Sequence, residues 1–122
     1  MYYKRVELKV TNQGIHEHKI FQGVKIFSRS KLSKDQKSIL TQKLYLTPKQ
    51  NIVFYQRTDV NYDQNWHHHK DYYELTYGQL DGETVFKVCQ DFDELNPFLE
   101  NELLKKLKEK QSTGKFFEKL DI

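Results

Sequence analysis

Histidine is the residue type of this chain whose spacing most readily suggests chemistry. Three histidines stand consecutively at His67, His68 and His69, and His16 and His18 lie two positions apart in a predicted hairpin loop. Imidazole binds zinc, copper or nickel well, but a structural site needs four firm ligands. Neither Cys89 nor the acidic residues stand at a recognised ligand spacing from the histidines. We therefore expect a solvated polar loop at 67–69, with no bound metal and no cofactor.

Catalytic motifs are missing from the sequence, which contains no G-x-S-x-G, no P-loop and no H-E-x-x-H. Cys89 ends an apolar segment, where a buried inert thiol is favoured over a nucleophile. The histidines with Glu17 and Arg29 could place a base beside cations, as a toxin-like nuclease requires. We predict no catalysis and keep the nuclease as a third alternative.

The stretch from 59 to 70 is the longest irregular segment, and it mixes aromatic with polar side chains. Tyrosine and tryptophan are enriched at interface hot spots, and long loops in compact domains are often functional. Packing of Trp66 back onto a sheet is an equally good interpretation. We expect a contact surface for a protein partner or a small ligand, formed by Tyr62, Trp66, His67, His68 and His69.

Composition sets the broad class. The 122 residues fit one domain, 1–122, and carry a net charge of +3 from 20 basic and 17 acidic residues. This excess is mild for a nucleic-acid-binding protein, but a basic loop with nearby tyrosines keeps that function as the runner-up. One cysteine allows no internal disulfide, and no apolar run is long enough for a membrane span or a signal peptide. We expect a cytoplasmic protein. The basic loop contains Arg29, Lys31, Lys34 and Lys37.

Alternation of apolar and polar residues predicts six strands, over 4–10, 18–28, 39–47, 52–58, 71–77 and 83–88. Short turns join most of them, which favours an antiparallel meander. In the second strand the period places Val24 and Ile26 on one face and Phe27 on the other. Residues 29–38 are polar and basic, and we expect an exposed loop there.

A helical period begins after the last strand. Asp91 and Glu94 stand at the spacing of a capping box, and Pro97 suits the first position of a second helix that extends to about Lys110. The fold class we predict is α+β, an antiparallel meander sheet of about six strands with two C-terminal helices packed on one face.

Three segments occur in the order found in one known family. The chain ends in E-x-L-D-I at 118–122, a hairpin joins 44–47 to 52–55, and a strand at 86–88 leads into helical residues 92–95 and then Glu102-Leu103. This order resembles the EXLDI family of small bacterial proteins. Many members carry an N-terminal segment like a ribbon-helix-helix DNA-binding module, and here residue 2 already opens a strand. The resemblance implies the sensor or partner-binding part of a bacterial regulator, although residues 49–51 lack the family's turn glycine.

The C-terminal segment offers apolar anchors to the domain. We expect it to dock and close the core, whereas capture by another protein through the terminal carboxylate is the alternative. A homodimer through an edge strand or an aromatic face also stays open. The anchors are Phe116, Phe117, Leu120 and Ile122.

Overall fold

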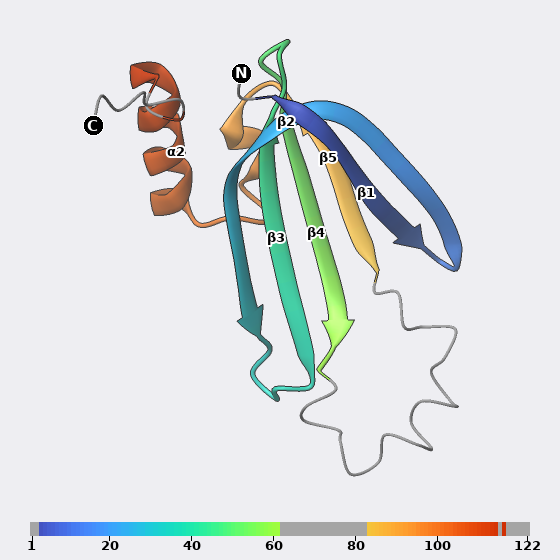
Figure 1. Cartoon of the computed structure of the whole chain (residues 1–122). Coiled ribbons are helices and arrows are strands. Elements are labelled where there is room, and N and C mark those ends of the chain that lie inside the picture. Colours follow the sequence, from blue (N-terminus) through green and yellow to red (C-terminus); the bar gives the residue numbers. More distant parts are fainter. Residues whose placement is uncertain (1–2, 62–82, 115, 117–122) are drawn as a thin grey trace, which may run out of the picture.

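The computed structural model describes residues 3–61, 83–114 and 116. These residues form a five-stranded antiparallel sheet in the order β1-β2-β3-β4-β5, followed by two helical segments (Figure 1). The α+β class and the antiparallel meander are thereby confirmed. The strands are β1 (Lys4–Asn12), β2 (Ile15–Leu32), β3 (Ser38–Leu46), β4 (Ile52–Val60) and β5 (Thr84–Cys89), and the helices are the 3-10 helix η3 (Phe92–Leu95) and α2 (Asn101–Thr113).

Six strands and two α-helices are not confirmed. The described residues contain five strands, one α-helix and one 3-10 helix. The strand predicted at 71–77 lies outside the described residues. At Asp91 the capping box is present, because its side chain accepts from the Asp93 N–H while the Glu94 carboxylate accepts from the backbone N–H of Asp91. It opens the short helix η3, and α2 begins after Glu100, so the start predicted at Pro97 is wrong.

The second strand is much longer than predicted, with 18 residues. Its first half, 15–23, pairs with β1, and its second half, 24–32, pairs with β3. The loop predicted for 29–38 is therefore wrong at 29–32 and at Ser38, which begins β3, and is confirmed at 33–37. The polar sequence of 29–32 is compatible with a strand because its backbone bonds to β3 while its side chains stay largely in water.

A bend at the middle of β2 carries the β1–β2 hairpin across one face of the sheet (Figure 1). Gly23 occupies the bend, where an added Cβ would lie 2.9 Å from the Phe21 ring. The register then shifts between Lys25 and Phe27. This bulge turns Phe27 toward the same core as Val24 and Ile26, so the predicted opposite face for Phe27 is wrong.

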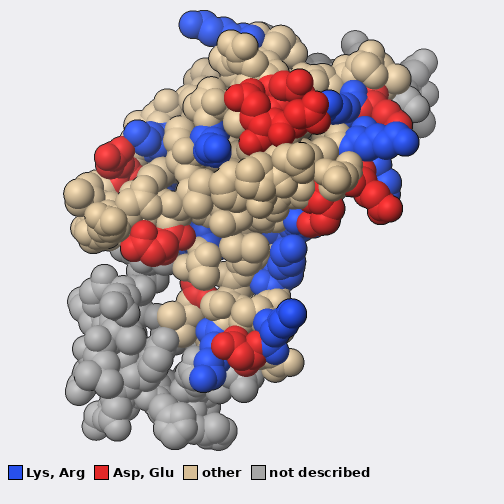
Figure 2. All heavy atoms as spheres, turned by 180° about the vertical axis from the view of Figure 1, so that it is seen from behind, with Lys and Arg blue, Asp and Glu red and all other residues tan. Residues whose placement is uncertain are grey.

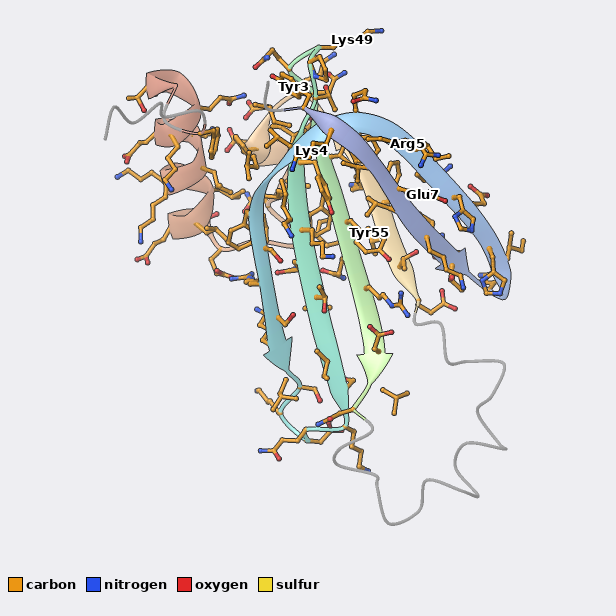
Figure 3. All side chains as sticks on the ribbon, in the orientation of Figure 1. Tyr3, Lys4, Arg5, Glu7, Lys49 and Tyr55 are labelled. Atoms are coloured by element: carbon orange, nitrogen blue, oxygen red, sulfur yellow. The ribbon has the colours of Figure 1, made fainter. Side chains whose placement is uncertain are left out.

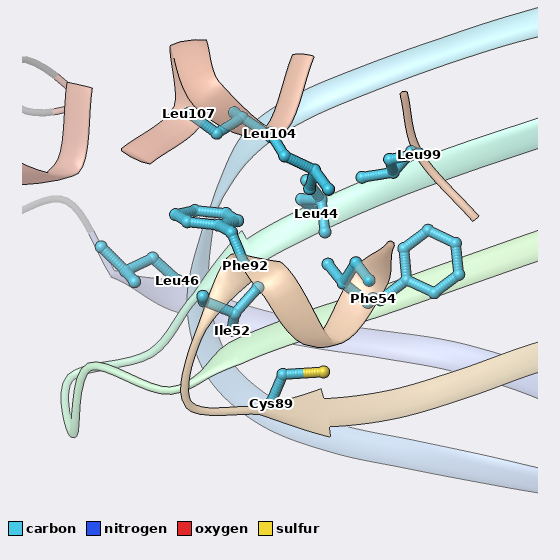
Figure 4. Packing of buried hydrophobic residues seen from close by; sticks show 10 residues of the cluster. Leu44, Leu46, Ile52, Phe54, Cys89, Phe92, Leu99, Leu104 and Leu107 are labelled. Carbon is cyan, nitrogen blue, oxygen red and sulfur yellow. The ribbon is translucent and has the colours of Figure 1, made fainter. Parts of the chain in front are cut away.

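The two faces of the sheet are covered by different elements. On one face, side chains of β3 and β4 meet η3, α2 and the residue Leu99 (Figure 4), so the C-terminal helical segments do pack on one face. On the other face, the hairpin covers a second, partly aromatic core formed by Leu8, Val10, Tyr45, Val53 and Tyr55. The strict alternation along β3, with Leu44 toward the helices and Tyr45 toward the hairpin, supplies both cores from one strand.

Candidate functional site

The hairpin leaves two hollows on the side of β1, and they follow one another along β1 and β3. The first has a volume of about 430 Å³ and the second about 350 Å³. We call the two together the trough. The first is lined by Lys4, Arg5, Val6, Gly23, Val24, Lys25 and Tyr45. The second is lined by Glu7, Leu8, Lys9, Thr41, Lys43, Tyr55, Arg57 and Asp59.

Positive charge dominates the lining of the trough. Six basic residues line it against two acidic ones, and no described acidic residue lines the first hollow. Figure 3 shows Lys4, Arg5 and Glu7 following one another along β1, and Tyr55 on β4. Seen from behind, by contrast, acidic and basic groups lie side by side (Figure 2). The basic residues of the trough are Lys4, Arg5, Lys9, Lys25, Lys43 and Arg57.

Strand register fixes these cations in place. Lys43 and Thr41 alternate with the core residues Leu44 and Gln42, so they point to the hairpin side of the sheet. Arg57 is the partner of Thr41 in the β3–β4 ladder and therefore joins the same row. Because the cations stand on strands, the trough presents a charge pattern that exists before any ligand arrives.

Both carboxylates of the trough already have partners. Glu7 lies 3.3 Å from the Arg5 guanidinium and 2.9 Å from Nδ1 of His18. Arg57 Nε donates to Asp59 at 2.7 Å. Burial of the guanidinium opposes its charge, yet the hydrogen bond and the charge of Asp59 raise the pKa of Arg57, so it stays protonated.

Three lysines of the trough have no acidic partner in the part of the chain that the structure describes. Lys4, Lys25 and Lys43 have no carboxylate of the described residues within ion-pair distance. Their charge is available to an anionic ligand.

Aromatic rings form the floor of the trough but are not offered to a ligand. Tyr45 and Tyr55 are only 6% and 5% exposed. The Tyr55 hydroxyl donates to the Lys9 carbonyl at 2.8 Å, and the Phe21 ring meets Tyr45 edge-on at 5.5 Å. Burial, and secondarily the neighbouring Tyr55, raises the pKa of Tyr45. The trough therefore provides charge and hydrogen bonds, and its tyrosines do not provide stacking surfaces.

The structure does not describe most of the residues singled out from the sequence. Tyr62, Trp66, His67, His68 and His69 fall outside the described residues, as do Phe117, Leu120 and Ile122. Phe116 packs against the core, with its ring centroid 6.4 Å from that of Phe92.

The two N-terminal histidines are in strand β2, so their predicted position in a loop is wrong. The Nδ1 atom of His16 lies 3.1 Å from the Thr11 hydroxyl, and His18 meets Glu7. Across the described ranges, no group of three or more metal-binding side chains comes together.

The predicted basic loop is also divided by the fold. Arg29 is on β2 and binds Glu100 through two hydrogen bonds of 2.8 and 2.6 Å, and Lys31 lies 3.9 Å from the same carboxylate. Lys34 and Lys37 stay in the turn, where Asp35 accepts from the Lys37 N–H. Arg29 is thus committed to a structural contact.

The trough residues were missed because each one, taken singly, resembles an ordinary exposed strand residue. One signal could have found part of the site. In the β3–β4 hairpin, Lys43 and Tyr45 stand two apart, and so do Tyr55 and Arg57. Pairing of the two strands must bring these residues onto one face.

Within the part of the chain that the structure covers, no helix has the length and apolar character needed to cross a membrane. Comparison with family models, with curated proteins and with solved structures finds no match for this chain.

Proposed function

We propose that this protein is a non-catalytic binding domain whose trough binds an extended, acidic segment of a protein partner. The observation that carries the proposal is the charge of the trough, with six basic residues against two carboxylates that are already paired. Complementary charge of this kind steers association and selects partners. Because the two hollows follow one another along the same strands, they suit an extended peptide better than a compact small molecule.

Single-stranded nucleic acid is the second candidate, because a row of lysines and arginines also suits a phosphate backbone. Proteins that bind single strands combine such a groove with exposed rings on which the bases stack. Tyr45 and Tyr55 are buried, so this second contribution is missing from the trough. We therefore favour the acidic polypeptide.

The wider setting is part of the same proposal. We infer a cytoplasmic, bacterial regulatory or interaction protein related to the EXLDI family. Its support is the order of sequence motifs and the α+β fold with an antiparallel sheet.

The test is fluorescence anisotropy with a labelled oligoglutamate peptide, a neutral Gly-Ser peptide of equal length and a random single-stranded RNA. Lys43→Glu reverses one charge inside the trough. Lys105→Glu makes the same change in net charge on the exposed side of α2, outside the lining of the trough, and is the matched control.

We expect K43E to weaken peptide binding about tenfold, which corresponds to about 1.4 kcal/mol of lost attraction. K105E should change binding less than about twofold, since screening weakens a distant charge. Equal losses in the two variants would mean diffuse attraction to a basic protein and would refute the trough as the site. If the RNA binds more tightly than the oligoglutamate peptide, and K43E weakens its binding to the same extent, the nucleic-acid candidate is favoured.

A further inference from the structure

In the described part of the chain, the outer edge of the first half of β2 is open. Residues 15–23 pair with β1 on one side, and the ladder to β3 begins only at Val24. Among the described residues, no strand pairs with the other side of 15–23. Figure 1 shows this half of β2 as the outermost strand beside β1. This edge is on the opposite side of the hairpin from the trough and is independent of the proposed function.

The hairpin geometry tells which backbone groups point outward. Gln13 and Gly14 form a two-residue turn with positive φ angles of 52° and 81°, and Asn12 pairs with Ile15 across it. Residues that flank a two-residue turn form a hydrogen-bonded pair, in which each backbone N–H donates to the C=O of the other residue. From this pair onward, hydrogen-bonded and non-hydrogen-bonded pairs alternate along the hairpin. Hence the N–H and C=O groups of His18, Ile20 and Gln22 point away from β1.

On β1, the same alternation places the backbone N–H and C=O groups that point away from β2 on the odd-numbered residues. The Tyr55 hydroxyl donates to the Lys9 carbonyl at 2.8 Å, and the Thr11 N–H donates to the Thr84 hydroxyl at 2.8 Å. Side chains thus bind the outward backbone groups of β1 at Lys9 and Thr11. No described side chain or backbone group does the same for the outward groups of His18, Ile20 and Gln22 on β2.

Apolar side chains surround the open edge. Ile15 and Ile20 are 65% and 55% exposed, and Val88 of the nearby β5 is 58% exposed. A hollow of about 300 Å³ between this part of β2 and β5 includes Phe21 and Phe86 in its lining. Proteins usually protect an open edge with charge, proline or a covering segment, so the exposed apolar side chains beside this edge favour it as a pairing site.

We propose that two copies of this chain pair antiparallel through residues 15–21 of β2, about a two-fold axis at His18. In this register Glu17 of each copy faces Lys19 of the other, and Ile15 faces Phe21. These pairs are the non-hydrogen-bonded ones, in which opposite side chains lie closest. An axis one residue away, at Glu17 or Lys19, would instead place like charges opposite each other.

Glu17 and Lys19 are suitably placed for this exchange. Within one chain they form an ion pair of 2.8 Å, so both side chains lie on the same side of the strand. In the dimer each would find its partner across the axis. A two-fold contact of this kind is self-complementary and closes without forming a fibre.

The test is a charge exchange read by sedimentation velocity at protein concentrations up to about 100 µM, since dimerisation follows mass action. Glu17→Lys and Lys19→Glu each place like charges opposite one another on both sides of the axis. The double variant E17K/K19E restores opposite charges in the same register. Far-UV circular dichroism checks that each variant is folded.

We expect a wild-type dimer, a dissociation constant raised at least about tenfold in each single variant, and recovery in the double variant. Glu17 is exposed, so E17K keeps the test decisive even if K19E unfolds. A wild-type monomer throughout the concentration range, an unaffected E17K dimer, or a folded double variant that stays monomeric would each overturn the proposal.

Discussion

Arg29 joins the sheet to the start of α2, and its replacement by methionine is the sharpest stability test the structure offers. Its guanidinium donates two hydrogen bonds to Glu100, and its Nε donates to Gln42 Oε1 at 2.7 Å. Gln42 is only 2% exposed and also donates to the Phe98 carbonyl at 3.2 Å. One arginine therefore holds the segment before α2 against β2 and β3.

The magnitude follows from what R29M leaves behind. Gln42 Oε1 would lose its donor in a buried position, which costs about 1–3 kcal/mol. The ion pair with the half-exposed Glu100 adds no more than about 1 kcal/mol, because water screens it. Methionine retains most of the apolar stem, so little packing is lost. We expect R29M to lower the free energy of unfolding by about 2–3 kcal/mol.

Urea denaturation followed by circular dichroism measures this loss, and its pH dependence separates the two contributions. Hydrogen bonding to Arg29 lowers the pKa of Glu100 from 4.5 to about 2. A lowered pKa stabilises the fold above the unfolded-state value, and this stabilisation disappears as the pH falls from about 4.5 to about 2.

The stability that R29M loses through the missing Glu100 contact should therefore become smaller as the pH falls through this range. The stability that it loses through the unsatisfied Gln42 should stay the same. Glu100→Gln should lack the same acid-dependent loss of stability. Glu109→Gln, an exposed change on the same helix, is the control and should behave like wild type. An R29M protein within about 0.5 kcal/mol of wild type at pH 7 would refute the assigned role of Arg29.

Three further predictions concern the core and the bend. Phe54→Ala should cost about 3–5 kcal/mol in urea denaturation, because Phe54 is fully buried beneath the helical segments, whereas the exposed Val88→Ala should cost less than about 1 kcal/mol. Gly23→Ala should cost about 1–3 kcal/mol, since its Cβ would meet the Phe21 ring at 2.9 Å, and unchanged stability would contradict the tight bend. Cys89 should react with a thiol reagent only as fast as the protein opens, because burial, and then the charge of Glu94, raise its pKa, and rapid labelling of the folded protein would contradict its placement.

The sequence pattern predicted the strands and the helix cap well wherever local chemistry decides. The alternation along β3 and β4 predicted both strands to within two residues at each end. Asp91 and Glu94 predicted the cap, because a capping box is a contact within one turn.

Features that depend on distant contacts were not predictable in this way. The extension of β2 to Leu32 rests on backbone pairing with β3, which polar side chains do not reveal. The bulge before Phe27 inserts one residue, and it reverses every face assignment after it. The segment before α2 is bound by Arg29 and Gln42, which contact Glu100 and Phe98 across more than fifty residues of sequence.

The candidate site was missed for a related reason. Lys9, Lys43 and Arg57 come together only because the hairpin folds over the face of the sheet that carries Tyr45 and Tyr55. Nothing in the spacing of β1 indicates that it will lie above β3 and β4. The bend at Gly23 decides this, and a single glycine in a strand has several possible meanings.

Amide chemical-shift mapping with the oligoglutamate peptide tests the trough most directly. We expect the largest shifts on residues 4–9, 25, 41–45 and 57, with little change along α2. Shifts concentrated on the lysines of α2, or spread evenly over all exposed basic residues, would contradict the trough as the site.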